Sequence, residues 1–165
     1  AEDGHIIWDR MFSQLWHQMF SPDGKKLAAH VSTDFGKWTV AVDADPWTVR
    51  FDELVTDMVF SPNSKRIATV AKDRGKWKIA VDNKVWADSF DMAWKPVFSP
   101  DSSHLAAKVE KTGRFSIIFD DRLWGRDFEA LWDPVFSPQG DKLLVRAIED
   151  GNYYRYIIPI TEFTR

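Results

Sequence analysis

Four histidines, His5, His17, His30 and His104, are the side chains best suited to acid–base or metal chemistry. Their spacing matches neither H-x-x-x-H nor H-E-x-x-H, and a lone histidine on a strand is usually a polar surface residue. The sequence also lacks G-x-S-x-G, a glycine-rich phosphate loop and a dinucleotide fingerprint. It therefore predicts no catalytic, cofactor-binding or metal-ligating residues, and a protein that is not an enzyme.

Acidic pairs such as Asp43-x-Asp45 and Asp120-Asp121 invite comparison with calcium loops. The glycine and glutamate of a calcium loop are absent from both places. An aspartate before a turn commonly caps it through side-chain hydrogen bonds, so we expect these aspartates to be structural.

The composition narrows the classes of partner. Hydrophobic residues make up 44% and charged residues 28%. The formal charge is −3, and lysine and arginine are scattered beside aspartate and glutamate, so the sequence lacks the clustered positive charge that nucleic acid requires. The apolar runs are too short for direct membrane insertion. With no cysteine, thiolate sites and disulfides are excluded; this favours the cytoplasm and leaves the periplasm open.

Three landmarks repeat with one period of 38 to 40 residues, which is the strongest signal in the sequence. Phe-Ser-Pro begins at positions 20, 60, 98 and 136, and Trp-x-x-x-Phe begins at 8, 47, 86 and 124. A glycine, a basic residue and an aromatic residue recur at 36–38, 75–77 and 113–115. Each copy contains four short segments with strand character separated by turn residues, as in KWKIAV at 76–81.

Four short antiparallel strands in about 39 residues predict the blade of a β-propeller. The whole chain is therefore predicted to be an all-β protein with four four-stranded blades. We expect a single domain over 1–165, with blades near 13–51, 52–90, 91–128 and 129–160 plus 4–12. The fourth copy has Pro159 where the others have aspartate, and no tryptophan follows it. Residues 4–12 are therefore expected to pair with 153–160 and complete the last blade.

Completion of that blade has two solutions. Within one chain it closes a four-bladed ring. Between two chains it gives a homodimer with an eight-bladed ring, the solution that blades of ordinary length favour.

The nine tryptophans fall into three repeat positions, which predicts packing between blades. The first position holds Trp8, Trp47, Trp86 and Trp124, and the second holds Trp16, Trp94 and Trp132, with Val55 in the second copy. The third holds Trp38 and Trp77, matched by Phe115 and an aromatic of the Tyr153-Tyr154 pair. Because this third position follows a turn, its members are the candidate binding residues, namely Trp38, Trp77, Phe115 and Tyr154.

The Phe-Ser-Pro-Asp-Gly segment at 20–24 and its following strand resemble the WD40-like repeat of TolB-type propellers. The segments KWTVAVDADPW (37–47), KWKIAVDNKVW (76–86), WDPVFSP (132–138) and VRAIEDGNYYRYIIP (145–159) are similar to the tryptophan-rich propeller subunit of the transmembrane redox complex of sulfate-reducing bacteria. That resemblance implies a non-catalytic subunit on the cytoplasmic side, held among haem and iron–sulfur partner proteins.

The leading functional hypothesis is thus a scaffold or protein-interaction module, a subunit or fragment of an electron-transfer complex. The alternative is a lectin-like propeller that binds carbohydrate through its repeated tryptophans. A third class, the accessory propeller of a hydrolase, would need a neighbouring catalytic domain.

Overall fold

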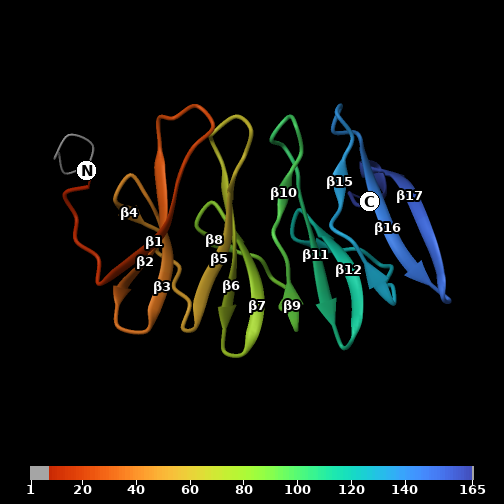
Figure 1. The fold of residues 1–165 in the computed structure, drawn as a ribbon, viewed down its shortest axis with the longest axis horizontal. Helices are drawn as coiled ribbons and strands as arrows, with labels where there is room; N and C mark the ends of the chain where they lie inside the picture. The colour runs from red at the N-terminus through yellow and green to blue at the C-terminus, as the bar shows by residue number, and fades with distance from the viewer. Residues whose placement is uncertain (1–7, 165) are drawn as a thin grey trace.

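A computed structural model of the chain describes residues 8–164, which form four antiparallel sheets standing side by side in a row (Figure 1). The first two sheets have four strands each: β1 (Gln14–Phe20), β2 (Leu27–Asp34), β3 (Lys37–Val42) and β4 (Asp45–Pro46), then β5 (Leu54–Phe60), β6 (Ile67–Asp73), β7 (Lys76–Val81) and β8 (Lys84–Val85). The third and fourth are β9 (Met92–Ala93), β10 (Val97–Phe98), β11 (Leu105–Lys111), β12 (Arg114–Phe119) and β13 (Arg122–Leu123), then β14 (Ala130–Leu131), β15 (Val135–Phe136), β16 (Lys142–Glu149) and β17 (Asn152–Pro159). The all-β prediction with one sheet per repeat is confirmed.

The first strand of each sheet is interrupted at its middle. In the first two sheets the interruption is a change of register, with His17 at a φ of 51° and Asp57 at a φ of 49°. In the last two sheets Pro96 and Pro134 follow the equivalent position, and the strand is split into two short pieces. Proline cannot donate a ladder hydrogen bond, so the two devices produce the same break.

The recurrent aspartates hold the turn between the third and fourth strands. The carboxylates of Asp43, Asp82 and Asp120 accept hydrogen bonds from the backbone N–H groups that begin β2, β6 and β11, at 2.8, 2.9 and 2.9 Å. All three aspartates have a φ between 45° and 49°, a left-handed conformation that aspartate tolerates. Their structural role agrees with the sequence analysis.

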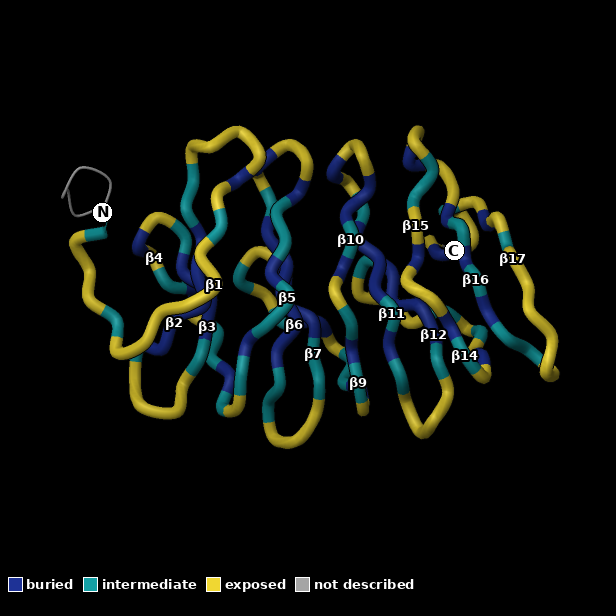
Figure 2. The backbone as a smooth tube through the Cα atoms, in the orientation of Figure 1, coloured by how far each residue is buried: buried dark blue, intermediate teal, exposed yellow. Residues whose placement is uncertain are grey.

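Three hydrophobic clusters fill the seams between successive sheets, and the buried strands of Figure 2 border them. Trp47 and Trp86 are buried in the first two seams, and Trp124 packs in the third. Three members of the first tryptophan series therefore pack between sheets, and the fourth, Trp8, packs against the first sheet.

Two polar ties also cross the seams. The backbone N–H of Asp23 donates to Oγ of Ser64 (3.1 Å), and the N–H of Asn63 donates to Oγ of Ser102 (3.0 Å). On the outer side, Oδ1 of Asn83 accepts from the backbone N–H groups of Thr48 (2.8 Å) and Val49 (3.2 Å), as Oδ1 of Asp121 accepts from Ala87 (2.8 Å).

The residue at one repeat position beside the seams differs from one sheet to the next. In the third seam Lys108 Nζ lies 3.2 Å from a carboxylate oxygen of Asp133 in the next sheet. The equivalent residue is Val70 in the second sheet and His30 in the first, both fully buried.

The two ends of the row do not meet within the chain (Figure 1). Trp8 and Phe12 pack against the first sheet, at the opposite end from β17, whose one strand partner among residues 8–164 is β16. The expected pairing of 4–12 with 153–160 is therefore absent from the single chain as far as residues 8–12 are concerned; 4–7 lie outside the described residues. Pairing between two chains stays a prediction.

None of the helical segments within residues 8–164 is long and apolar enough to cross a membrane.

Candidate ligand-binding groove

The second and third repeat positions lie on the two strands that flank the central one, and their aromatic side chains come together in the first, third and fourth sheets. Trp16 and Trp38 stack in parallel with ring centroids 4.9 Å apart and planes 3° apart. In the third and fourth sheets the equivalent pairs are Trp94 with Phe115 (5.8 Å) and Trp132 with Tyr153 (5.6 Å).

Strand register corrects two assignments made from the sequence. Thr56, not Val55, is the counterpart of Trp16, since Thr56 pairs with Val70 as Trp16 pairs with His30. Tyr153, not Tyr154, is the counterpart of Phe115, because their strand partners are Ile148 and Glu110 at equivalent positions.

The candidate binding residues are not gathered in one place; each belongs to a different sheet. Trp77 and Phe115 are half-buried and pack against the clusters of the second and third seams. Tyr154 stacks on Tyr156, with ring centroids 5.6 Å apart. Trp38 is the member of the set that lines a well-formed groove.

That groove, which we call the first-seam groove, has a volume of about 480 Å³ and lies between the first two sheets. Trp16, half of whose surface is exposed (50%), stands at its side against the stacked Trp38. The lining residues are Trp16, His17, Trp38, Glu53, Leu54, Val55 and Thr56. An apolar wall with a few polar groups is the usual composition of a ligand site.

Glu53 is the charged group of the groove, and it is held in place by its neighbours. Lys72 Nζ lies 2.9 Å from one carboxylate oxygen, and the backbone N–H of Gly75 donates to the other. The hydrogen bond from Lys72, and then that from Gly75, keep the pKa of Glu53 below its ordinary value of 4.5. The groove therefore presents a fixed carboxylate beside an aromatic surface.

A second cavity of about 220 Å³ adjoins the groove, and His17 lines both. Its wall includes His30, which is fully buried (0% exposed) and whose two ring nitrogens have no hydrogen-bond partner among the described residues. Burial, and secondarily the charge of His17 at a ring distance of 5.3 Å, lowers the pKa of His30 from 6.5 to about 4. The sequence analysis expected His30 at the surface, and that expectation is wrong.

His104 also differs from a free surface residue. Its Nδ1 lies 2.6 Å from Oδ2 of Asp120, and both side chains are half-buried. The pair joins the turn before β11 to the turn after β12.

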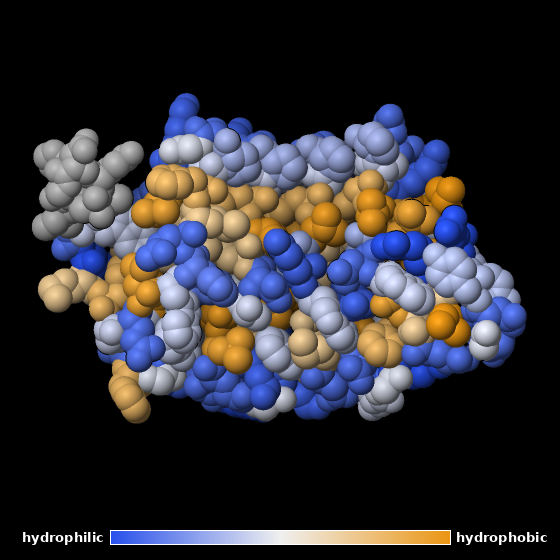
Figure 3. All heavy atoms as spheres, viewed as in Figure 1, coloured by the Kyte–Doolittle hydropathy of each residue, from blue (hydrophilic) through white to orange (hydrophobic). Residues whose placement is uncertain are grey.

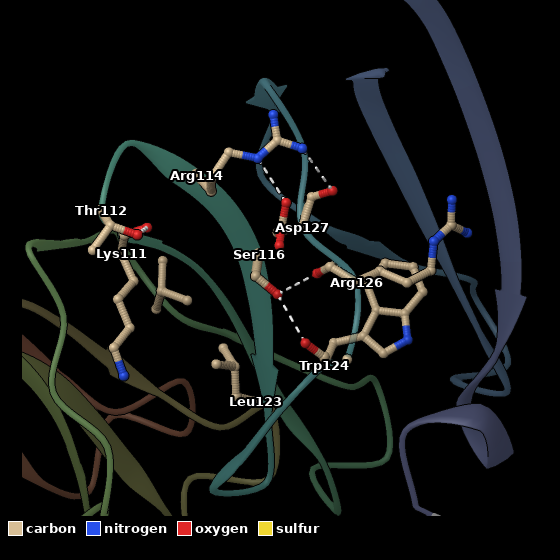
Figure 4. A pocket seen from close by; sticks show the side chains of 10 residues that line it. Lys111, Thr112, Arg114, Ser116, Leu123, Trp124, Arg126 and Asp127 are labelled. Carbon is tan, nitrogen blue, oxygen red and sulfur yellow. Dashed lines mark hydrogen bonds and ion pairs between the residues drawn. The ribbon is translucent and has the colours of Figure 1, made fainter. Parts of the chain in front are cut away.

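A basic pocket of about 290 Å³ lies on the third sheet (Figure 4). Arg114 Nε lies 2.6 Å from Oδ1 of Asp127, and Ser116 Oγ donates to the carbonyl oxygen of Arg126 at 2.7 Å. Arg126 in turn lies 3.2 Å from Glu149. Arg114 and Arg126 are thus both paired with carboxylates of the chain.

Across residues 8–164, no three histidine, aspartate or glutamate side chains come close enough to hold a metal ion. Among the described residues that line the first-seam groove and the adjoining cavity, no nucleophile is hydrogen-bonded to a base.

No protein-family model matches the sequence, and no curated protein matches it either. Among solved structures, TolB from Acinetobacter baumannii is 17% identical with a TM-score of 0.54, over 90% of this chain and 41% of that one. The β-propeller domain of the Trilobed protease from Pyrococcus furiosus, with an open velcro topology, is 16% identical with a TM-score of 0.54, over 90% and 59%. A eukaryotic initiation factor is 15% identical with a TM-score of 0.54, over 96% and 44%.

The chain thus spans between 41% and 59% of the length of these structures, and at such identities the likeness concerns the fold. Four antiparallel sheets, stacked face to face through apolar seams, agree with it. The chain has the β-propeller fold shared by TolB, and its four sheets are blades of that fold.

Proposed function

We propose that the chain is a non-catalytic protein-interaction module whose first-seam groove receives an apolar or aromatic side chain of a partner protein. The observation that carries the proposal is the half-exposed Trp16, braced by Trp38 beside a fixed carboxylate, Glu53. Tryptophan is enriched among the few residues that supply most of the affinity of an interface, particularly where the partner is desolvated in a pocket.

The surface of the molecule also supports a protein partner. An apolar band crosses the upper part of the face shown in Figure 3. Contiguous apolar surface of this kind usually marks an interaction site.

The resemblance of the sequence supports the identity of the partner. We propose a subunit of a membrane redox complex, bound on its cytoplasmic side, with this chain serving as a scaffold that carries no redox centre. The sequence contains no cysteine to ligate an iron–sulfur cluster and no motif for covalent attachment of haem.

Binding of the purified chain to the purified redox complex, measured by isothermal titration calorimetry, tests the proposal. We expect Trp16→Ala to weaken binding roughly 30-fold, which corresponds to about 2 kcal/mol for a central aromatic anchor. Phe35→Ala is the matched control, because Phe35 is a fully exposed aromatic residue at a hairpin tip away from the groove. Equal affinities of the two variants would contradict the role of the groove.

A second candidate, carbohydrate binding, is favoured by the parallel Trp16–Trp38 stack beside the carboxylate of Glu53. Aromatic faces bind the apolar faces of sugars, while carboxylates accept hydrogen bonds from hydroxyl groups. Titration with a panel of neutral oligosaccharides should then quench tryptophan fluorescence in the native chain and not in Trp16→Ala. Unchanged fluorescence throughout the panel excludes this candidate.

A further inference from the structure

Both ends of the row expose repeat positions that the internal seams bury. Phe20 is 64% exposed on the first sheet, whereas Phe98 at the same position of the third sheet is 7% exposed. Ile157 is 71% exposed on β17, whereas its counterpart Phe119 is completely buried. Each end is therefore one half of a seam.

Residues 8–12 occupy a position that is equivalent to one filled in the other sheets. Trp86 and Phe90 belong to the outer edge of the second sheet and pack across the seam onto the third. Trp8 and Phe12 pack in the same way onto the first sheet, against Ala29, Val31 and Ala41. Residues 8–12 thus lie where the outer strand of a preceding sheet would lie.

The opposite end offers the sheet that such a strand would complete. In the first sheet the outer strand bonds to β3 through Trp47 N–H to the Val40 carbonyl (2.8 Å) and through a reciprocal pair between Trp38 and Phe51 (2.8 and 2.9 Å). The fourth sheet has β17 at its edge, and the chain then turns away, with Phe163 packing back on Phe119 at a centroid distance of 5.0 Å. No strand within residues 8–164 covers that edge.

We propose that two copies of this chain associate head to tail, each supplying residues 8–12 as the outer strand of the other copy's last sheet. By repeat equivalence Phe12 lies opposite Tyr153, and Trp8 N–H donates to the carbonyl oxygen of Arg155. Both pairs of ends are used once, so the assembly closes as a ring of eight sheets with two-fold symmetry.

A second copy fits the polar groups of this end. Arg155 stands where Val40, Ile79 and Ile117 are buried, and its guanidinium can stack on the incoming Trp8 and Phe12. An arginine already does so inside the chain, where Arg126 lies 5.2 Å from the ring centroids of Trp124 and Phe128.

Arg146 supplies an independent indication. Its Nε is buried and has no hydrogen-bond partner among the described residues. Arg146 is the counterpart of Lys108, which reaches across the third seam to Asp133. Across the new seam the counterpart of Asp133 is His17, exposed on the first sheet of the second copy, and an imidazole nitrogen that carries no proton can accept a hydrogen bond from Nε.

Sedimentation-velocity ultracentrifugation of the 165-residue chain tests the proposal through its mass. We expect twice the 19.1 kDa of one chain. Phe20→Asp and Ile157→Asp should each give single chains, since both residues are exposed in one chain and buried in the new seam. Phe35→Asp, a change of the same kind at a hairpin tip, should keep the double mass.

A mass of 19.1 kDa for the native chain, or an open series of larger assemblies, overturns the proposal. The proposal is also overturned if the native chain has the double mass but Phe20→Asp and Phe35→Asp change that mass equally.

The strand pairing itself is tested by a disulfide, because the chain contains no cysteine. The reciprocal pair formed by Trp38 and Phe51 implies a Cα separation of about 5.5 Å at the equivalent positions, within the range that a disulfide spans. The double variant Phe12→Cys, Tyr153→Cys should oxidise to a species of two linked chains on a non-reducing gel. An intrachain disulfide would instead indicate a four-sheet ring and overturn the proposal; if the variant does not fold, the masses above decide.

Discussion

His30 carries a cost that its counterpart Val70 does not. Both side chains are fully buried, but the imidazole leaves two ring nitrogens without partners, and burial lowers its pKa to about 4. In the unfolded chain this histidine has a pKa of about 6.5, whereas His30 in the folded chain has a pKa of about 4. Between these two pH values the unfolded state therefore binds a proton that the folded state does not bind. The free energy of unfolding therefore falls as the pH is lowered from about 6.5 to about 4.

We predict that His30→Val removes this part of the pH dependence. Between pH 7.5 and pH 5.0 the native chain should lose about 2 kcal/mol more unfolding free energy than the variant, from 1.36 kcal/mol per pH unit below about 6.5. At pH 7.5 the variant should be at least as stable, since a buried polar group without partners is removed. Urea unfolding at the two pH values measures both effects, and parallel losses in the two proteins would refute the prediction.

The side chain of Asn83 forms hydrogen bonds to the preceding sheet. Its Oδ1 serves two backbone N–H groups and the hydroxyl of the preceding sheet's outer loop, while its own φ is 66°. Aspartate performs the same task at position 121.

We predict that Asn83→Ala lowers the free energy of unfolding by roughly 2 kcal/mol, from lost hydrogen bonds and from alanine in a left-handed conformation. Asn83→Asp keeps the acceptor and should stay within about 0.5 kcal/mol of the native chain. Chemical denaturation of the three proteins checks this, and a loss in Asn83→Asp equal to that in Asn83→Ala would show that the acceptor is unimportant.

At the scale of elements, the turns that follow the Phe-Ser-Pro motifs form a ladder across the sheets. Ser64 and Ser102 accept from the turn before them, but Gly140 stands at that position in the fourth sheet and has no side chain to accept from Asp101. This hydrogen bond is therefore missing at the third seam. There the ion pair between Lys108 and Asp133 and the hydrophobic cluster around Phe119 link the two sheets.

We predict that Ser102→Ala costs about 1 kcal/mol, the usual net value of a partly buried hydrogen bond. Ser102→Gly should cost less, because glycine relaxes the left-handed conformation that Ser102 adopts at a φ of 66°. Thermal unfolding of both variants gives the comparison; a larger loss for the glycine variant would contradict it.

The elements were largely predictable from the sequence, because turn residues and alternating apolar residues repeat with the landmarks. The register was not, and Asp52 shows why. It is the additional residue in the link between the first and second sheets, so counting forward from Phe51 gives Val55 and counting back from Phe60 gives Thr56 as the counterpart of Trp16. Only the hydrogen-bonded pairs decide between them.

The site was less predictable than the sheets. Trp38 was identified as a candidate, but Glu53, Leu54 and Thr56 enter the first-seam groove from the next sheet, with no motif to announce them. His17 and His30 are 13 positions apart and meet through a break in β1, where His17 has a φ of 51°. A lone histidine carries no periodic signal, so its burial had to be seen in the structure.

At the scale of the whole molecule, stability is expected to vary along the row. Sheets in the middle have both faces covered, whereas β1 and β17 each present exposed apolar residues at an end. In repeat architectures such end units open more readily than central ones.

We predict that amide hydrogen exchange is slowest in β6, β7, β11 and β12 and fastest in β17 when the chain is held as a single copy by Ile157→Asp. In the native chain, β17 should be protected if a second copy covers its edge. Exchange followed by mass spectrometry reports both, and rapid exchange of β17 in the native chain would oppose that association.

The differing polar residues of the seams make near-identical sheets non-interchangeable. Lys108 finds a carboxylate in Asp133, while Val70 sits in an entirely apolar cluster. A sheet stacked out of order would leave the ammonium group of Lys108 without the carboxylate of Asp133. The different side chains at this repeat position therefore favour one order of the four sheets. They also disfavour the exchange of similar sheets between chains during folding.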